Sequence, residues 1–260
     1  MMAELIDRKR LKEEARALLE TAQVSPKAMA ALYGGLLLIL NMVSVLAGGE
    51  GFLSTFAGIL TGLLSMVLET GLVLYCMAVR RCERAEYLTI FDGFSFVGKL
   101  IGLNLVMAAF IWLWSLLFVV PGIVAAYRYR FAPYNLCENP GIGVMEALDM
   151  SKRQTMGYKG QLFALDLSYL GWIVLATLPS IVETGMLYYG AFVSALDYMS
   201  GAISVMPTDL TAFAVLPPWL WTLIAGAWQM AVVIFYLPHY RCVDLAYFDT
   251  AKRTSGVGGV

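Results

Sequence analysis

The topology of this chain depends on residues 122–138, which read GIVAAYRYRFAPYNLCE. The segment is apolar and aromatic, but it also contains Arg128, Arg130 and Pro133. As a helix it would be about 25 Å long, slightly less than the roughly 30 Å hydrocarbon core of a bilayer. Hydropathy alone therefore leaves open whether the segment is a loop or a short membrane crossing.

The rest of the chain has the composition of a membrane protein. Of its 260 residues, 60% are hydrophobic and 14% are charged, whereas roughly a quarter of the residues in a soluble domain are charged. The apolar residues form blocks that approach or exceed the roughly 20 residues needed to cross a bilayer. Besides residues 122–138, the predicted membrane spans are residues 28–47, 56–79, 100–120, 161–182 and 219–237.

The positions of the basic residues favour six crossings over five. Lys and Arg are enriched in cytoplasmic loops, and here they cluster before the first span, after the second, around residues 152–159 and after the last. The loops at residues 48–55 and 183–218 contain none. With six crossings every basic cluster lies on one side, whereas five crossings would place one terminal cluster outside. The sequence thus predicts cytoplasmic N- and C-termini.

These observations predict an all-α, polytopic membrane protein with a six-helix bundle as its single membrane domain, residues 28–238. Residues 1–27 are expected to form a cytoplasmic amphipathic helix, and residues 239–260 a cytoplasmic tail. A second cytoplasmic amphipathic helix is expected at residues 142–156, between spans four and five. Apolar residues at helical spacing predict one apolar face on each of these helices. They are Leu11, Ala15, Leu18 and Ala22 in the first helix, and Ile142, Met145 and Leu148 in the second. The first helix is interpreted as a surface helix near lipid headgroups, with docking of a partner as the alternative.

Four charged residues fall inside predicted spans, namely Glu69, Arg128, Arg130 and Asp166. A charge within the bilayer is costly and is by default a functional hypothesis. Matching their depths by residue count suggests two pairs, Glu69 with Arg128 and Asp166 with Arg130. The pairs could fix the register of the helices, or unpaired members could line a substrate or ion pathway. A carboxylate paired in this way has a lowered pKa and is a poor general acid.

Small residues and a proline pair suggest how the helices meet. Gly58 and Gly62 on the second span, and Gly98 and Gly102 at the third, recur at near-helical spacing that permits close packing of helices in lipid. Packing within one subunit and self-association are both compatible with this pattern. Pro121-Gly122 is expected to form a tight extracytoplasmic turn, with a broken helix lining a cavity as the alternative.

Features of catalytic and metal sites are largely missing from the sequence. There is no GxSxG, HExxH, Walker A or GxGxxG motif, and no CxxC pair. The only histidine is His239. The cysteines Cys76, Cys82, Cys137 and Cys242 all fall near cytoplasmic ends of spans, so no disulfide is expected. The sequence predicts no metal, no cofactor and no enzymatic activity, and the net charge of −1 disfavours nucleic-acid binding.

The middle of the chain resembles a known family. Residues 119–172 contain a Pro-Gly-Ile break, an Arg-Tyr pair, an Asn-Pro turn, a Glu-Ala-Leu and Ser-Lys helix, a Met-Gly-Tyr-Lys close and a later Gly-Trp. The residues that carry these motifs include Pro121, Gly122, Arg128, Tyr129, Asn139, Pro140, Glu146, Ser151, Lys152, Gly157 and Trp172. This run resembles the Gram-positive membrane family catalogued as domain of unknown function 975. The resemblance implies a six-helix protein of the bacterial inner membrane whose activity is not established, and residues 183–218 are longer than that family leads us to expect.

The sequence supports three interpretations of function. The first is a non-catalytic membrane component for assembly, scaffolding or regulation in the bacterial envelope. The alternative is a small-solute or ion transporter or channel that uses the intramembrane charges, and an intramembrane enzyme is the third. The expected partners are the lipid bilayer and either further copies of the chain or other membrane proteins, with no nucleic acid.

Overall fold

The computed structural model describes residues 6–48, 51–201 and 216–256, and every regular element in these ranges is a helix. In chain order the elements are α1 (Arg8–Glu20), α2 (Pro26–Leu46), α3 (Phe52–Arg80), the 3-10 helix η1 (Tyr87–Phe96), α4 (Val97–Leu117), α5 (Val119–Tyr129), α6 (Ala132–Glu138), α7 (Val144–Gln154), α8 (Lys159–Met199) and α9 (Pro218–Ser255). The predicted all-α class is confirmed.

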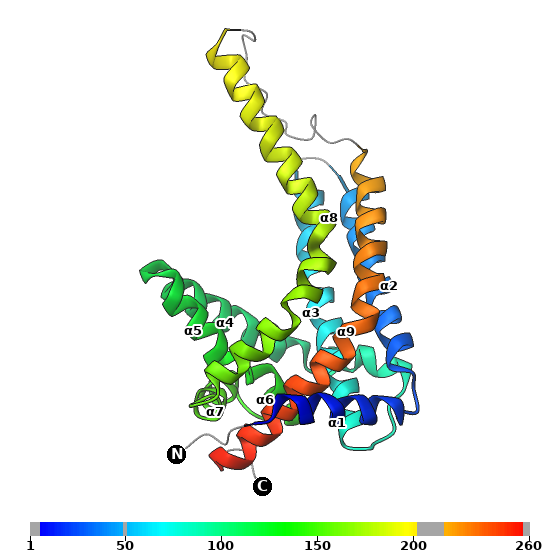
Figure 1. The fold of residues 1–260 in the computed structure, drawn as a ribbon, viewed down its shortest axis with the longest axis vertical. Coiled ribbons are helices and arrows are strands. Elements are labelled where there is room, and N and C mark those ends of the chain that lie inside the picture. The colour runs from blue at the N-terminus through cyan, green and yellow to red at the C-terminus, as the bar shows by residue number, and fades with distance from the viewer. Residues whose placement is uncertain (1–5, 49–50, 202–215, 257–260) are drawn as a thin grey trace.

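Figure 1 shows how these helices are arranged. Helices α2, α3, α8 and α9 run roughly along the long axis, and α1 lies across their lower ends. The antiparallel pair α4 and α5 leans to one side, whereas α6 and α7 lie near the same end as α1. The C-terminal end of α9 also lies at this end of the molecule, near the beginning of α1.

Five helical segments in the described part of the chain are long and apolar enough to cross a membrane. They are Pro26–Leu46, Phe52–Arg80, Tyr87–Leu117, Lys159–Met199 and Trp219–Ser255. Residues 122–138, predicted as the fourth span, do not form one continuous helix. The segment divides into the end of α5, a break at Arg130–Phe131, and the seven-residue α6. Pro133 explains the break, because it has no N–H to donate to the carbonyl of Tyr129.

Two helices are longer than the sequence predicted. Residues 183–199, expected to belong to a loop, continue α8 through Pro179 to give 41 helical residues. Residues 202–215 of the expected loop lie outside the described residues. The predicted tail at residues 239–260 is helical as far as Ser255, since α9 continues through Pro238. An internal proline tends to kink a helix without ending it where neighbouring helices hold it, and α9 changes direction along its length (Figure 1).

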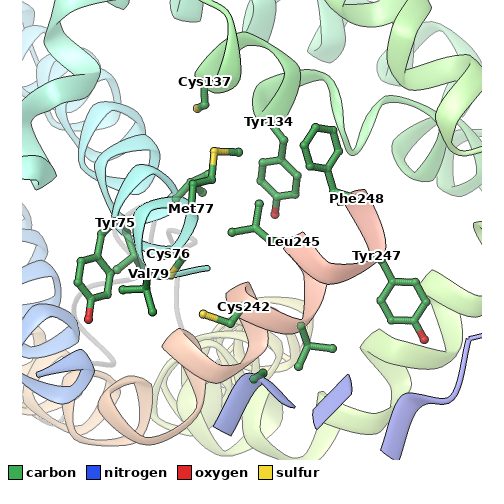
Figure 2. Close-up of a cluster of buried hydrophobic side chains, with 14 of the residues drawn as sticks. Tyr75, Cys76, Met77, Val79, Tyr134, Cys137, Cys242, Leu245, Tyr247 and Phe248 are labelled. Atoms are coloured by element: carbon green, nitrogen blue, oxygen red, sulfur yellow. The ribbon is translucent and has the colours of Figure 1, made fainter. Parts of the chain in front are cut away.

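The buried core lies at the end of the molecule that holds α1, α6 and the C-terminal half of α9. In Figure 2, Cys76 of α3 lies toward Cys242 of α9 and Met77 lies toward Tyr134 of α6. Tyr75 points away from them, and its hydroxyl donates to the carbonyl of Val24 (2.8 Å). Fully or almost fully buried side chains in this cluster include Tyr75, Cys76, Phe131, Leu162, Cys242, Tyr247 and Phe248. Cys76, Cys82, Cys137 and Cys242 are all free thiols, as predicted. The other end of α2, α3 and α8 instead exposes large apolar side chains, which suits helices surrounded by lipid.

The face that α7 buries differs from the predicted one. Ala147 and Leu148 are fully buried together with Ser151 and Gln154. Met145, which was placed on the apolar face, is 52% exposed. The helix therefore packs a mixed apolar and polar face into the protein, against α5, α6 and α9.

Close approach of backbones occurs at glycines other than the four that were predicted. A methyl group added at Gly58, Gly62 or Gly98 would meet no atom within 4 Å, and one at Gly102 would make an ordinary 3.6 Å contact with Val144. Of the four, Gly102 therefore approaches another described segment, α7, whereas Gly58, Gly62 and Gly98 face open space. Self-association through these glycines stays a prediction. At Gly71 of α3, by contrast, an added methyl would clash with the backbone carbonyl of Ile90 in η1.

Gly71→Ala should destabilise the protein, because the clash involves backbone atoms that cannot rotate away. Overpacking of this kind costs about 1–3 kcal/mol or more. Thermal unfolding in detergent, followed by loss of the monodisperse peak, measures the effect. Gly58→Ala on the same helix is the matched control and should leave the melting temperature unchanged. Equal melting temperatures of the two variants would contradict the close packing of Gly71 against Ile90.

Candidate functional site

The break between α5 and α6 leaves backbone groups that α7 satisfies. The Oγ of Ser151 accepts a hydrogen bond from the N–H of Phe131 (3.1 Å) and donates one to the carbonyl of Arg128 (2.9 Å). Asn135 of α6 and Gln154 of α7 exchange two side-chain hydrogen bonds of 2.8 Å, and both residues are buried. A buried backbone group without a partner would cost about 1–3 kcal/mol, so α7 acts as a support that holds the break in place.

Arg130 lies at this break and binds two other helices. Its Nη1 and Nη2 donate to the two carboxylate oxygens of Asp166 on α8 (2.7 and 2.9 Å). Its Nε donates to Asp244 on α9 (3.0 Å), and Nη2 also reaches the hydroxyl of Tyr240 (2.7 Å). A planar guanidinium offers five N–H donors, which lets one side chain bind two carboxylates. Arg130 therefore connects the broken fourth segment to both long C-terminal helices.

Tyrosines complete the hydrogen bonding of the two carboxylates. Asp244 is 1% exposed and accepts a hydrogen bond from the hydroxyl of Tyr134 (2.5 Å). Asp166 accepts hydrogen bonds from the hydroxyls of Tyr127 (2.7 Å) and Tyr240 (2.8 Å). Carboxylates within an apolar region are tolerated when they are paired and their lone pairs are occupied. These contacts therefore suit ionised carboxylates.

A second ion pair joins α3 to α9. Arg241 donates from Nη2 to the carboxylate of Glu69, and its Nη1 lies 3.4 Å from the hydroxyl of Tyr134. The Nε of Arg241 is buried and has no hydrogen-bond partner among the described residues. A cavity of about 220 Å³ lies beside this pair and is lined by both arginines, Glu69, Asp244, Asn104 and Thr70. Because Tyr134 contacts both Asp244 and Arg241, the two ion pairs form one network.

The network carries a net charge of −1 if every member is ionised, since three carboxylates (Glu69, Asp166, Asp244) face two guanidiniums (Arg130, Arg241). The network lies near the beginning of α8. Asp166 lies seven residues after Lys159, the first residue of the helix, which corresponds to about 10 Å. The charges are therefore grouped toward the end of the bundle where α1 and α7 lie.

One of the two predicted pairs is present and the other is wrong. Arg130 and Asp166 form the predicted pair. Glu69 pairs with Arg241 instead of Arg128. Arg128 lies near α7, where the pKa of Asp149 is lowered chiefly by a hydrogen bond from Lys152 and also, more weakly, by the charge of Arg128. Arg128 and Arg130 are two residues apart at the end of α5 and therefore point to different sides of that helix. Arg241 takes the place predicted for Arg128 because α9 continues as a helix beyond residue 237.

Sequence reasoning missed Tyr127, Tyr134, Tyr240, Arg241 and Asp244. The last three belong to the predicted tail, residues 239–260, which the structure shows to be a continuation of α9. The sequence did contain a usable signal, since Tyr240 and Asp244 are four residues apart and lie on one face of any helix that continues through Pro238.

Comparison with known proteins agrees with the resemblance seen in the sequence. A family described as "Protein of unknown function (DUF975)" matches residues 116–248, about half of the chain. The chain belongs to the DUF975 family. No curated protein and no solved structure matches the chain. The matched DUF975 region runs from the end of α4 to the C-terminal part of α9 and therefore contains Arg130, Asp166 and Asp244.

The DUF975 motif residues before and at α7 shape the backbone. A methyl group at Gly122 would clash with the hydroxyl of Ser115, so glycine lets α5 turn back closely against α4. Asn139 accepts a hydrogen bond from the N–H of Gly141 (3.0 Å), which forms the turn at Asn139-Pro140. The Glu146 carboxylate caps the start of α7 by accepting from the N–H of Gly143 (3.3 Å). The expected turn precedes Pro121-Gly122, since Phe118 is the extended residue and Pro121 lies in the first turn of α5.

The other DUF975 motif residues make side-chain contacts or complete turns. Tyr129 is buried and stacks on Phe110 of α4, with ring centroids 5.8 Å apart. Lys152 pairs with Asp149 (2.6 Å). Gly157 has a φ of +88°, which favours glycine, in the turn before α8. Trp172 stacks on Tyr236 of α9, with centroids 6.2 Å apart. Most of the DUF975 motif thus has an explanation in the folding of residues 116–248.

The described residues contain no group of three or more His, Cys, Asp and Glu side chains that could hold a metal ion. His239 and Cys242, which are three residues apart, have different partners. His239 binds Tyr169 and the backbone of Lys12, whereas Cys242 lies fully buried in the core beside Cys76.

Arg130→Met should strongly destabilise the protein, because it removes the salt-bridge partner of both Asp166 and Asp244. Removal of one partner from a buried ion pair costs about 3–5 kcal/mol. Thermal unfolding of the purified protein in detergent measures the loss. Arg128→Gln is the matched control and should cost less than about 0.5 kcal/mol, since its side chain forms no salt bridge with a described residue. Equal destabilisation by the two substitutions would show that Arg130 is not the residue that joins the helices.

Proposed function

We propose that this DUF975 protein is a multi-pass protein of the bacterial inner membrane with both termini in the cytoplasm. An even number of crossings is supported by α1 and the C-terminal end of α9, which lie at the same end of the molecule (Figure 1). Helices α2, α3, α8 and α9 account for four crossings. The remaining apolar segment, η1 with α4, forms the third crossing along the chain. Helices α5 and α6 together form the fourth, which is broken, so the chain crosses the membrane six times.

The basic residues support the cytoplasmic assignment of this end. Arg80 pairs with Asp249 (2.6 Å), and Glu138 binds both Arg81 (2.6 Å) and Lys252 (2.8 Å). These ion pairs join the ends of α3, α6 and α9, so basic residues from distant parts of the sequence gather together. Cytoplasmic loops are enriched in Lys and Arg, and α1 with its basic residues lies at this same end.

Cys82 gives a direct test of the orientation, because it is the exposed cysteine among the four free thiols. A membrane-impermeant maleimide should label it rapidly in inside-out vesicles and slowly in right-side-out vesicles. Cys82→Ala should remove the signal, since Cys76, Cys137 and Cys242 are buried. Labelling that is faster in right-side-out vesicles would reverse the proposed topology.

We further propose that the protein is a non-catalytic component that assembles with another protein of the envelope. The observation that carries this proposal is the length of α8. Its 41 residues correspond to about 60 Å, twice the roughly 30 Å hydrocarbon core. Tilt alone does not accommodate this excess, so the C-terminal part of α8 extends past the core on the extracytoplasmic side.

This extension carries a large apolar and aromatic surface. Its strongly exposed side chains include Tyr188, Tyr189, Phe192, Tyr198 and Met199. The extension rises away from the other labelled helices (Figure 1). Aromatic residues and Met are enriched at protein interfaces, and an apolar surface of this kind outside lipid marks an interaction site. A helical partner protein that covers α8 beyond the bilayer best accounts for it.

Site-specific photo-crosslinking in cells tests the assembly. A photoreactive phenylalanine analogue at Tyr189 and at Phe192 should give one discrete adduct, with the same protein identified by mass spectrometry from both positions. The control position is Leu105, an exposed residue of the apolar helix α4, where only lipid adducts are expected. Phe192→Asp should abolish co-purification of the captured protein. An adduct of twice the mass of the chain would identify the partner as a second copy, and the absence of protein adducts at both positions would refute the proposal.

A transporter or channel is the second candidate, and the cavity beside Glu69 and Arg241 favours it. Charged groups and a broken helix at membrane depth are used by transporters to bind ions and polar substrates. The contacts count against this function, however, because Arg130, Arg241 and all three carboxylates of the network have oppositely charged partners. This pairing is the main reason for preferring a structural role for the network.

A further inference from the structure

A second and larger cavity lies between α1 and the two C-terminal helices. Its volume is about 910 Å³, within the roughly 300–1,000 Å³ typical of small-molecule sites. Lys12 and Arg16 of α1 and Lys27 at the start of α2 line one side. The other side is formed by aromatic residues of α8 and α9, which are Tyr169, Trp172, Phe235 and Tyr236.

The cations of this cavity lack anionic partners. None of Lys12, Arg16 and Lys27 forms a salt bridge with a carboxylate of the described residues. Glu13 and Glu20 also line the cavity, so three positive charges face two negative ones. The pKa of Lys12 is lowered, chiefly by burial and secondarily by the charge of Arg8. An anion bound beside Lys12 would favour its charged form and so oppose this lowering of its pKa.

The wall on the α1 side is held firmly in place. The Nε2 of His239 lies 2.9 Å from the backbone carbonyl of Lys12 and must donate to it, since a carbonyl only accepts. In the neutral imidazole Nδ1 then accepts from the hydroxyl of Tyr169 (2.6 Å). The Nζ of Lys12 donates to the hydroxyl of Ser168 (3.1 Å) and lies 4.5 Å from the centre of the Tyr169 ring. The sole histidine thus joins α1 to α8 and α9, and the cationic side chains start from a fixed backbone.

The aromatic wall opens toward the bilayer. Phe235 is 65% exposed and Trp172 is 43% exposed, and both belong to helices that are apolar enough to cross a membrane. Lys27 lies 5.8 Å from the centre of the Phe235 ring, where the cationic and apolar walls meet. A ligand that fits has an anionic end between the cations and an apolar end against the aromatic side chains.

We propose that this cavity binds an anionic phospholipid of the inner leaflet, with its phosphate between Lys12, Arg16 and Lys27 and its acyl chains along Trp172 and Phe235. The proposal rests on the cytoplasmic orientation of α1 proposed above. Basic pockets beside transmembrane helices on the cytoplasmic side recognise anionic headgroups in this way. The lipid would connect α1 to the bundle and would make the position of α1 depend on the anionic lipid content of the membrane.

Native mass spectrometry of the full-length protein in detergent tests the proposal, with phosphatidylglycerol and phosphatidylcholine as probes. The variant Lys12→Gln/Arg16→Gln/Lys27→Gln should weaken retention of phosphatidylglycerol by at least about tenfold. The matched control is Lys9→Gln/Arg10→Gln/Arg84→Gln, which removes the same charge from exposed residues outside the cavity and should retain the lipid. Ala22→Trp keeps every charge but fills the cavity, and it should also lose the lipid. Melting temperatures check that each variant is folded.

Several outcomes would overturn the proposal. Equal retention of phosphatidylcholine and phosphatidylglycerol by the wild-type protein would show that headgroup charge is not recognised. Equal loss in the cavity variant and the control would indicate diffuse attraction of lipid to a basic surface. Competition by glycerol phosphate at the same concentration as the lipid would identify a site for a free anion. Crosslinking from Tyr189 is unaffected by the cavity substitutions, so failure of the lipid site and failure of the proposed assembly are distinguishable.

Discussion

Arg130 carries its charge at a point where the chain has stopped being a continuous helix, and the arrangement of the C-terminal half depends on how that charge is neutralised. A guanidinium in an apolar region is stable only when its N–H groups are paired. Asp166 and Asp244 supply the pairing from two helices that are far apart in sequence. Any arrangement that separated α8 or α9 from the α5–α6 break would leave a carboxylate or the guanidinium unpaired.

The break itself is stable because α7 compensates for it. Pro133 removes one helical hydrogen bond, and the hydroxyl of Ser151 then satisfies the N–H of Phe131 and the carbonyl of Arg128. The buried pair of Asn135 and Gln154 holds α6 against α7 in the same region. Polar side chains therefore satisfy the backbone groups at the break, which water would hydrate in a soluble protein. This accounts for a buried face of α7 that is partly polar.

Packing is uneven along the length of the molecule. The core and the ion pairs are gathered at the end that contains α1, α6 and the C-terminal part of α9, whereas α2, α3 and α8 expose apolar side chains toward the other end. Lipid gives no hydrophobic drive for helices to pack together, so close van der Waals packing, hydrogen bonds and ion pairs hold them in place. Helix α1 follows the same principle, since His239 and Arg8 bind it to the bundle through hydrogen bonds.

The sequence by itself determined the helical class, the apolar segments, the family and the pair of Arg130 with Asp166. These properties follow from composition, from local hydropathy and from residues close in depth on neighbouring segments. The tertiary structure decided that Glu69 meets Arg241, that α8 and α9 continue through Pro179 and Pro238, and that Ser151 supports the α5–α6 break. A proline ends a helix only if its neighbours cannot hold the freed backbone groups, and those neighbours come from distant parts of the chain. Local sequence therefore could not reveal which charges would be brought together, because that depends on which helices continue and where one of them turns.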